Sequence, residues 1–238
     1  MITGGTRGIG AAVAARLAAQ GHDLILGYRR DTEAAERTVT ELTALGVECV
    51  AVPGDLTDPT AVDELFAVAE RAGGLTGVVN NAGLTEHSAP LAETPVEVIR
   101  YGVQANLVAP LWVARAAVRL LGRSFGGSGG VIVNVSSAAA TLGSANEYVH
   151  YAAAKAGVDT LTIGLAQEVA SDGIRVVGVA PGLIRTEIHQ AGRLDRLAPS
   201  VPMGRAGEPD EVAATISWLL SDQASYLTGT TVRVSGGR

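Results

Sequence analysis

Tyr151 and Lys155 stand four positions apart in the run YAAAK, and this spacing places both side chains on one face of a helix. A free tyrosine has a pKa near ~10 and is a poor base at neutral pH, but a neighbouring ammonium group favours its phenolate form. General acid–base catalysis is most effective when the pKa of the group lies near the operating pH. Because such pairs are common on ordinary helices, the surrounding residues decide whether this one does chemistry.

Two hydroxyl side chains, Ser136 and Ser137, come directly after the β-branched run 131–135 (VIVNV), which predicts a buried strand. Open α/β sheets bind ligands at the carboxyl ends of their strands. We therefore expect a serine here to hydrogen-bond a substrate oxygen while Tyr151 transfers the proton. Asn106 lies midway in a predicted helix and has two interpretations. Either it kinks the helix and holds a water near Lys155, or it faces solvent with local backbone bonding.

A glycine-rich turn, TGGTRGIG at 3–10, leads into a helical segment at 11–19. Gly4, Gly8 and Gly10 allow backbone amides to approach a pyrophosphate at the helix N-terminus, where the helix dipole favours an anion. A strand, a helix and the acidic turn 54–56 (GDL) follow at a suitable spacing and favour nucleotide binding. The alternative interpretation is a tight turn that only caps a helix.

The end of the second predicted strand indicates which nicotinamide cofactor binds. Sites that prefer NAD carry an acid there for the ribose hydroxyls, whereas here Tyr28 leads into Arg29 and Arg30, and the first acid is Asp31. We expect Arg29 to face a 2′-phosphate, with Arg7 joining from the turn, because guanidinium pairs well with phosphate. The sequence thus favours NADP(H) over NAD. Alternatively, Arg30 and another of these arginines are solvated surface charges.

Strand-like and helix-like segments alternate along the chain and must position these residues. Apolar, β-branched runs predict strands at 23–28, 48–53, 77–80, 131–135, 174–179 and 231–234. Helical periodicity predicts helices at 11–19, 32–45, 58–72, 95–121, 151–170 and 210–220. Strands separated by single helices imply an α/β fold with one Rossmann-type, doubly wound parallel sheet flanked by helices on both faces. Since we find no linker, repeat or composition break, we expect residues 1–238 to form one dinucleotide-binding and catalytic domain.

Three segments fit this pattern less well. Only Met1 and Ile2 precede the turn, whereas a strand needs about five residues, so we expect a truncated first strand and a natural chain that starts upstream. Residues 123–130 (RSFGGSGG) predict a flexible surface loop. Residues 184–202 are long and irregular, and their leucines and isoleucines indicate a partly apolar lid that contacts the substrate.

The composition excludes several classes of protein. Hydrophobic residues make up 47% and charged residues 18% of the 238 residues, which is enough for a sizeable core. A net charge of −6 argues against a nucleic-acid surface. We find no apolar run of about 18 residues and no secretory leader, so we expect a cytoplasmic protein without a membrane segment. Cys49 is the only cysteine and the four histidines lack ligand spacing, so neither a disulfide nor a metal site is expected.

Several features occur in order over essentially the whole chain: the turn at 3–10, the run NNAG at 80–83, Asn106, Ser137, the Tyr151–Lys155 pair, and the dipeptide at 181–182. Together they resemble the short-chain dehydrogenase/reductase family. The resemblance implies hydride transfer to or from nicotinamide C4, a small-molecule ketone or alcohol as substrate, and a homodimer or homotetramer. It also implies a catalytic tetrad of Asn106, Ser137, Tyr151 and Lys155. The implied cofactor contacts are Gly4, Thr6, Arg7, Gly8, Ile9, Gly10, Tyr28, Arg29, Asp55, Leu56, Asn81, Ala82, Gly83, Tyr151, Lys155, Pro181, Gly182, Ile184 and Thr186.

The serine position departs from the family pattern. Ser137 precedes Tyr151 by 14 positions, where the family more often shows 13, the position that Ala138 occupies here. We interpret 143–150 (GSANEYVH) as carrying one extra residue, so that Ser137 keeps its role and Ser136 is the alternative. The extended segment is similar to a bacterial glucose 1-dehydrogenase-like or sugar dehydrogenase subgroup. Four polar side chains in or near the substrate loops are either substrate contacts or exposed polar groups: His87, Glu147, His150 and His189.

Two other functions are alternatives to the oxidoreductase. One is a catalytically silent nucleotide-binding regulator or structural subunit, since a fold does not determine a function; an altered tetrad would favour it, and all four residues are present here. The other is lyase or epimerase chemistry, in which the cofactor is retained without net oxidation. The sequence does not identify the substrate, because 184–202 contacts it and has no predictable conformation.

Overall fold

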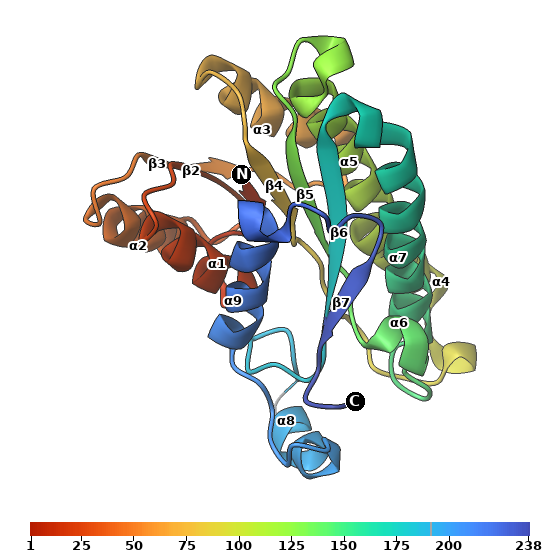
Figure 1. Cartoon of the computed structure of the whole chain (residues 1–238). Coiled ribbons are helices and arrows are strands. Elements are labelled where there is room, and N and C mark those ends of the chain that lie inside the picture. Colours follow the sequence, from red (N-terminus) through yellow and green to blue (C-terminus); the bar gives the residue numbers. More distant parts are fainter. Residues whose placement is uncertain (191) are drawn as a thin grey trace.

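Seven parallel strands form one sheet in the order β3-β2-β1-β4-β5-β6-β7 (Figure 1). The computed structural model describes residues 1–190 and 192–238. The strands are β1 (Ile2–Thr3), β2 (Leu24–Tyr28), β3 (Cys49–Pro53), β4 (Gly77–Asn80), β5 (Gly130–Val135), β6 (Ile174–Pro181) and β7 (Thr231–Val234). The strand order reverses between β1 and β4. At such a switch point the loops that follow neighbouring strands diverge and leave a crevice.

Helices cover both faces of the sheet, and the predicted doubly wound α/β fold is confirmed (Figure 1). One face carries α1 (Gly8–Ala18), α2 (Thr32–Thr43) and α9 (Pro209–Leu220). The other carries α3 (Pro59–Arg71), α5 (Ala109–Leu121) and α7 (Val149–Val169). Each face has its own hydrophobic cluster, with Val13 and Ile216 in one and Leu65 and Val113 in the other. The central strands are buried on both sides, which explains their continuous apolar runs.

The long helix predicted at 95–121 is interrupted in the middle. It consists of α4 (Val96–Val103), the π-helical turn η2 (Gln104–Val108) and α5. Pro110 has no N–H to donate to the carbonyl of Asn106 four positions earlier, so regular α-helical bonding does not continue through this turn. The wider turn lies at Asn106, where a kink is one of the two interpretations of the sequence.

The segment 184–202 is less irregular than predicted. It contains the short helix α8 (Arg193–Leu197) and the 3-10 turn η5 (Ala198–Ser200). Leu194 and Leu197 pack on a small cluster formed by Leu183, Val201 and Ala206, so part of the apolar surface of this segment is buried. Residues 123–130 begin with the 3-10 turn η3 (Arg123–Phe125). The other short helices are η1 (Leu91–Glu93), α6 (Ala139–Leu142), η4 (Ala170–Asp172) and η6 (Asp222–Ala224).

Strand β1 has two residues and still pairs on both sides. Ile2 and Thr3 are in register with Leu26 and Gly27 of β2, and Ile2 is also opposite Val79 of β4. The short strand therefore delivers the turn at 3–10 to the carboxyl edge of the sheet, where Figure 1 also shows α6, α8 and the C-terminus. Within residues 1–190 and 192–238, no helix has the length and apolar character needed to cross a membrane.

Candidate active site

A cavity of about 1060 Å³ extends along the carboxyl edge of the sheet, from the turn at 3–10 to α7 and α8. All the residues predicted for the site line it, except Gly10 and Asn106. These two residues lie behind the cavity wall, where Gly10 is close to the backbone of Gly4 and Asn106 is hydrogen-bonded to the backbone of Leu84 and Gly102. The topology thus gathers residues from the whole length of the chain at one switch point of the sheet.

The glycine turn has the backbone form that anion binding requires. Gly4 and Gly8 have φ of 63° and 52°, a region that favours glycine. A Cβ on Gly10 would lie 2.0 Å from the carbonyl oxygen of Gly4, so only glycine fits there. Helix α1 starts at Gly8 with no side-chain cap and no acid in its first turn. Its first N–H groups and the positive end of its dipole are therefore available to an anion.

Thr3 and Asn81 join this turn to the loop that follows β4. The Thr3 hydroxyl accepts hydrogen bonds from the backbone N–H groups of Asn81 and Ala82, both at 2.9 Å. The Asn81 side chain donates to the carbonyl oxygens of Thr3 at 3.0 Å and Gly4 at 3.2 Å. Sequence reasoning included Thr3 in the motif but missed its role, because its partners are more than seventy positions away.

Arg29, Tyr101 and Asp55 form a polar chain at the far end of the cavity. Arg29 Nη1 donates to the Tyr101 hydroxyl at 2.5 Å, and this hydroxyl donates to Asp55 Oδ2 at 3.4 Å. Burial raises the pKa of Asp55, but hydrogen bonds from Thr57 and the charge of Arg29 outweigh it and leave the pKa below its ordinary value. Asp31 instead caps α2 by accepting from Ala34 N at 3.0 Å. Tyr101 was not predicted as a site residue.

Tyr151 and Lys155 lie on the same face of α7, as their spacing predicts. Lys155 Nζ lies 5.8 Å from the centroid of the Tyr151 ring and donates to Val135 O at 2.8 Å. Burial lowers the pKa of Lys155 to about 8, although the charge of Asp159 acts in the opposite direction. Burial raises the pKa of Tyr151, against the effects of its polar contact with Ser137 and of the positive charge on Arg193.

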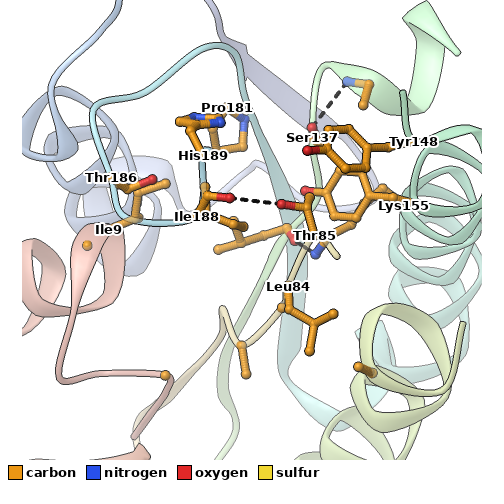
Figure 2. Close-up of a pocket in the computed structure, with 18 of the residues that line it drawn as sticks. Ile9, Leu84, Thr85, Ser137, Tyr148, Lys155, Pro181, Thr186, Ile188 and His189 are labelled. Carbon is orange, nitrogen blue, oxygen red and sulfur yellow. Dashed lines mark hydrogen bonds between the residues drawn. The ribbon is translucent and has the colours of Figure 1, made fainter. Parts of the chain in front are cut away.

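The two candidate serines have different surroundings. Ser136 is 3% exposed and its hydroxyl donates to Lys155 O at 3.1 Å, so it helps to pack β5 against α7. The Ser137 hydroxyl is in polar contact with Tyr151 and accepts from Ala139 N at 3.1 Å, and Figure 2 shows it on the same side of the pocket as Tyr148 and Lys155. In the segment 143–150, which leads into α7, Ser144 and Asn146 have positive φ, a conformation typical of tight turns.

Asn106 is buried, with 1% of its surface exposed, and does not face solvent. Its Oδ1 accepts from Leu84 N at 3.0 Å, while its Nδ2 donates to Leu84 O and to Gly102 O, both at 2.9 Å. A Cβ built on Gly83 would lie 2.9 Å from Asn106 Oδ1 and 3.3 Å from Lys155 Nζ. The Asn106 amide group and the Lys155 ammonium group therefore both lie close to the backbone of Gly83. Asn106 thus holds the loop after β4 beside Lys155.

The loop after β4 and the loop after β6 meet at one side of the cavity. The Thr85 hydroxyl donates to Ile188 O at 2.9 Å and connects the two sides of the pocket, as the dashed line in Figure 2 shows. Glu147 and His189 line the cavity, whereas His150 is buried outside it and His87 is not among the lining residues. Two arginines of α8, Arg193 and Arg196, also line it. Their contact with Glu147 was not predicted, since it joins segments that are far apart in the sequence.

Comparison with known proteins agrees with this geometry. Residues 4–238 match the family model described as "Enoyl-(Acyl carrier protein) reductase". The chain belongs to the short-chain dehydrogenase/reductase family. It is an NAD(P)-dependent enzyme that acts on CH–OH groups, as the oxidoreductases among its relatives indicate.

Three similar proteins illustrate the relationship. An uncharacterized oxidoreductase of Escherichia coli, YgfF, is 41% identical over 100% of this chain and 98% of its own length. The 3beta-hydroxysteroid dehydrogenase 1 of Eggerthella lenta is 39% identical over 100% of this chain and 92% of its own. A short-chain dehydrogenase of Burkholderia cenocepacia, crystallised with NADP, is 34% identical with a TM-score of 0.91, over 99% of this chain and 96% of its own.

Proposed function

We propose that this enzyme uses NADP(H) to interconvert a carbonyl and an alcohol, with Tyr151 as the general acid and base. The observation that carries the proposal is the shared cavity: Tyr151, Lys155 and Ser137 line the same space as the glycine turn. A proton-transfer group and a dinucleotide-binding turn at one switch point favour redox chemistry over a silent nucleotide-binding role.

The residues present fit a dinucleotide. The uncapped start of α1 and the glycines of the turn suit its pyrophosphate. Asp55, Leu56, the loop 81–83, Ile184 and Thr186 all line the cavity, which supports the contacts to adenine, ribose and the nicotinamide amide that the family resemblance implies. When bound, the cofactor supplies or accepts a hydride at nicotinamide C4.

In the reductive direction, Ser137 holds the carbonyl oxygen and Tyr151 donates its hydroxyl proton to the developing alkoxide. A charged Lys155 beside the ring favours the resulting phenolate, because opposite charges stabilise each other at low exposure. Asn106 keeps the loop after β4 in place next to the ammonium group through its three backbone hydrogen bonds. Lys155, with Asn106 and a water molecule, then returns the proton to Tyr151. Oxidation of an alcohol follows the same steps in reverse.

The preference for NADP(H) over NAD rests on the residues after β2. Arg7, Arg29 and Asp31 all line the cavity, but the carboxylate of Asp31 accepts from Ala34 N and caps α2. A guanidinium group at this edge pairs with a 2′-phosphate, and Tyr28 and Arg29 stand at the end of β2, where sites that prefer NAD carry an acid. Rates of purified protein with NADPH and NADH test this directly. A clear preference for NADH would contradict it.

The substrate class requires a panel of compounds. The resemblance to sugar dehydrogenases supports hydroxylated carbonyl compounds, and the charged wall of Glu147 and Arg193 supports a polar substrate. We would follow NADPH absorbance with sugars and sugar lactones, steroid ketones, simple ketones and 3-oxoacyl thioesters. We expect turnover with at least one class, and a sugar is the first candidate. Binding of NADPH without any turnover across the panel would favour the silent regulator.

We also propose that the enzyme works as a homodimer or homotetramer. Large apolar side chains are exposed on α5, α7 and α9 and near the C-terminal strand, among them Leu111, Ile163, Trp218 and Tyr226. Exposed apolar groups of this size favour association. Light scattering of the purified protein gives the mass in solution. A monomer at micromolar concentration would contradict the proposal.

A further inference from the structure

Tyr101 of α4 joins two residues that follow neighbouring strands, Arg29 after β2 and Asp55 after β3. Its hydroxyl oxygen accepts a hydrogen bond from Arg29 Nη1 at 2.5 Å, and its proton is donated to Asp55 Oδ2 at 3.4 Å. All three residues line the cavity. An ionised carboxylate can only accept hydrogen bonds, so the phenol proton points to Asp55 and a lone pair of the oxygen faces Arg29. The Tyr101 hydroxyl is therefore oriented as an acceptor for the guanidinium group.

Several contacts fix Tyr101 against the turn that follows β3. Asp55 Oδ1 accepts from the backbone N–H and from the hydroxyl of Thr57, at 3.0 and 2.8 Å. Gln104, which follows Tyr101 in the same helical segment, donates from Nε2 to Thr57 O at 3.3 Å. Tyr101 and Asp55 are half-buried, whereas Arg29 is exposed. The tyrosine hydroxyl is thus the fixed partner, and the long arginine side chain takes its orientation from it.

Arg29 keeps its charge and most of its donors for a ligand. A guanidinium group has several N–H donors, and Tyr101 accepts from Nη1 alone. Within residues 1–190 and 192–238, the ion pairs do not include Arg29, so no carboxylate neutralises it by direct contact. Asp31 caps α2 instead. A long exposed side chain loses rotamer freedom when it binds a ligand, and the bond to Tyr101 removes part of that cost in advance.

We propose that Tyr101 is a positioning residue that determines cofactor specificity: its hydroxyl holds the Arg29 guanidinium in the orientation that binds the 2′-phosphate of NADP(H). This inference rests on the proposed preference for NADP(H) and extends it to a residue of α4. Tyr101 acts through Arg29, because the hydrogen bond between them is what orients the guanidinium group. The adenosine ribose of NAD carries a 2′-hydroxyl instead of a phosphate, so the effect of Tyr101 is confined to the phosphorylated cofactor.

The first test measures equilibrium binding of NADPH and NADH by their nicotinamide fluorescence, without substrate or turnover. Tyr101→Phe keeps the aromatic ring and removes only the hydroxyl group. We expect it to raise the Kd for NADPH by about threefold to tenfold, the effect of one hydrogen bond, and to leave the Kd for NADH unchanged. Tyr226→Phe is the matched control, since it removes a hydroxyl from a fully exposed tyrosine, and it should change neither Kd. An unchanged or lower Kd for NADPH in Tyr101→Phe, or equal weakening of both cofactors, would overturn the inference.

The second test is a double-mutant cycle of the same binding constants with Arg29→Met. Because Tyr101 acts through Arg29, Tyr101→Phe should cause no further rise in the Kd for NADPH once Arg29 is replaced. A full, additive rise in the double variant would show that Tyr101 acts independently of Arg29 and would contradict the inference. Failure of the proposed cofactor preference appears separately, as an Arg29→Met variant that binds NADPH as tightly as the wild type does. A loss of NADPH affinity in Arg29→Met with none in Tyr101→Phe contradicts the inference about Tyr101 alone.

Discussion

The substitution Asn106→Asp tests the hydrogen bonding that holds the loop after β4. Aspartate has nearly the same shape as asparagine, so the change replaces one N–H₂ group by an oxygen and leaves the packing intact. The remaining oxygen still accepts from Leu84 N. The new oxygen, however, faces the carbonyl oxygens of Leu84 and Gly102, which accept from the amide at 2.9 Å in the wild type. Three acceptors then meet in a buried place without a proton between them.

The magnitude follows from these contacts. Two hydrogen bonds are lost at about 1 kcal/mol each, and leaving buried acceptors unsatisfied costs about 1–3 kcal/mol more. We expect a loss of roughly 3 kcal/mol or more in the free energy of unfolding at neutral pH. Protonation of the aspartate restores one of the two bonds, so the folded state raises the pKa of this group above its unfolded value. The stability of the variant is therefore highest below the unfolded pKa and falls as the pH rises through the folded one.

The assay is urea unfolding, followed by circular dichroism from mildly acidic to neutral pH. The quantity of interest is the difference from wild type at each pH, with the slope against urea checked for constancy. Asn146→Asp adds the same charge at an exposed position and serves as the control. We expect the Asn106→Asp difference to grow with pH and the Asn146→Asp difference to stay nearly constant. A variant as stable as wild type at neutral pH, or a pH-independent loss, would refute the reasoning.

Three further substitutions test the cofactor and substrate sides of the cavity. Arg29→Met should raise the KM for NADPH by about tenfold to a hundredfold, with little change in the KM for NADH. The control Arg30→Met, whose residue does not line the cavity, should change neither KM. Equal losses for both cofactors would contradict the 2′-phosphate contact. Ser137→Ala should lower kcat by about tenfold or more at an unchanged melting temperature. Ser136→Ala should mainly lower the melting temperature. The reverse pattern would assign the catalytic role to Ser136. Gly10→Ala should weaken NADPH binding in a fluorescence titration, because its Cβ would lie 2.0 Å from a carbonyl oxygen of the turn; an unchanged Kd would argue against this site.

The parts of the fold that local patterns determine could be predicted from the sequence. Buried parallel strands read as short β-branched runs, and the ends of Gly77–Asn80 and Thr231–Val234 agree to the residue. The start of α3 follows from Asp58, whose side chain accepts from Thr60 N at 2.9 Å just before Pro59. The spacing of Tyr151 and Lys155 places both on one helix face for the same local reason.

Features that depend on distant contacts could not be predicted. Thr3 and Asn81 lie 78 positions apart, and the contact between Glu147 and Arg193 joins positions separated by 46. No local pattern records such pairs. The π-helical turn at Asn106 had a local signal in Pro110, which removes one helical hydrogen bond, but the periodicity of the surrounding residues still favoured one long helix. In 184–202, Leu194 and Leu197 lie on α8 and pack against Leu183, Val201 and Ala206, whereas the sequence alone indicated an irregular segment.

The central claim, that Tyr151 transfers the proton, is tested most directly by the activity of Tyr151→Phe. Phenylalanine keeps the ring and its packing on α7 and removes only the hydroxyl group. With the substrate found in the panel, we predict that kcat/KM falls by about a hundredfold or more, while NADPH binds with wild-type affinity and the melting temperature is unchanged. Turnover of Tyr151→Phe near the wild-type rate would contradict the account.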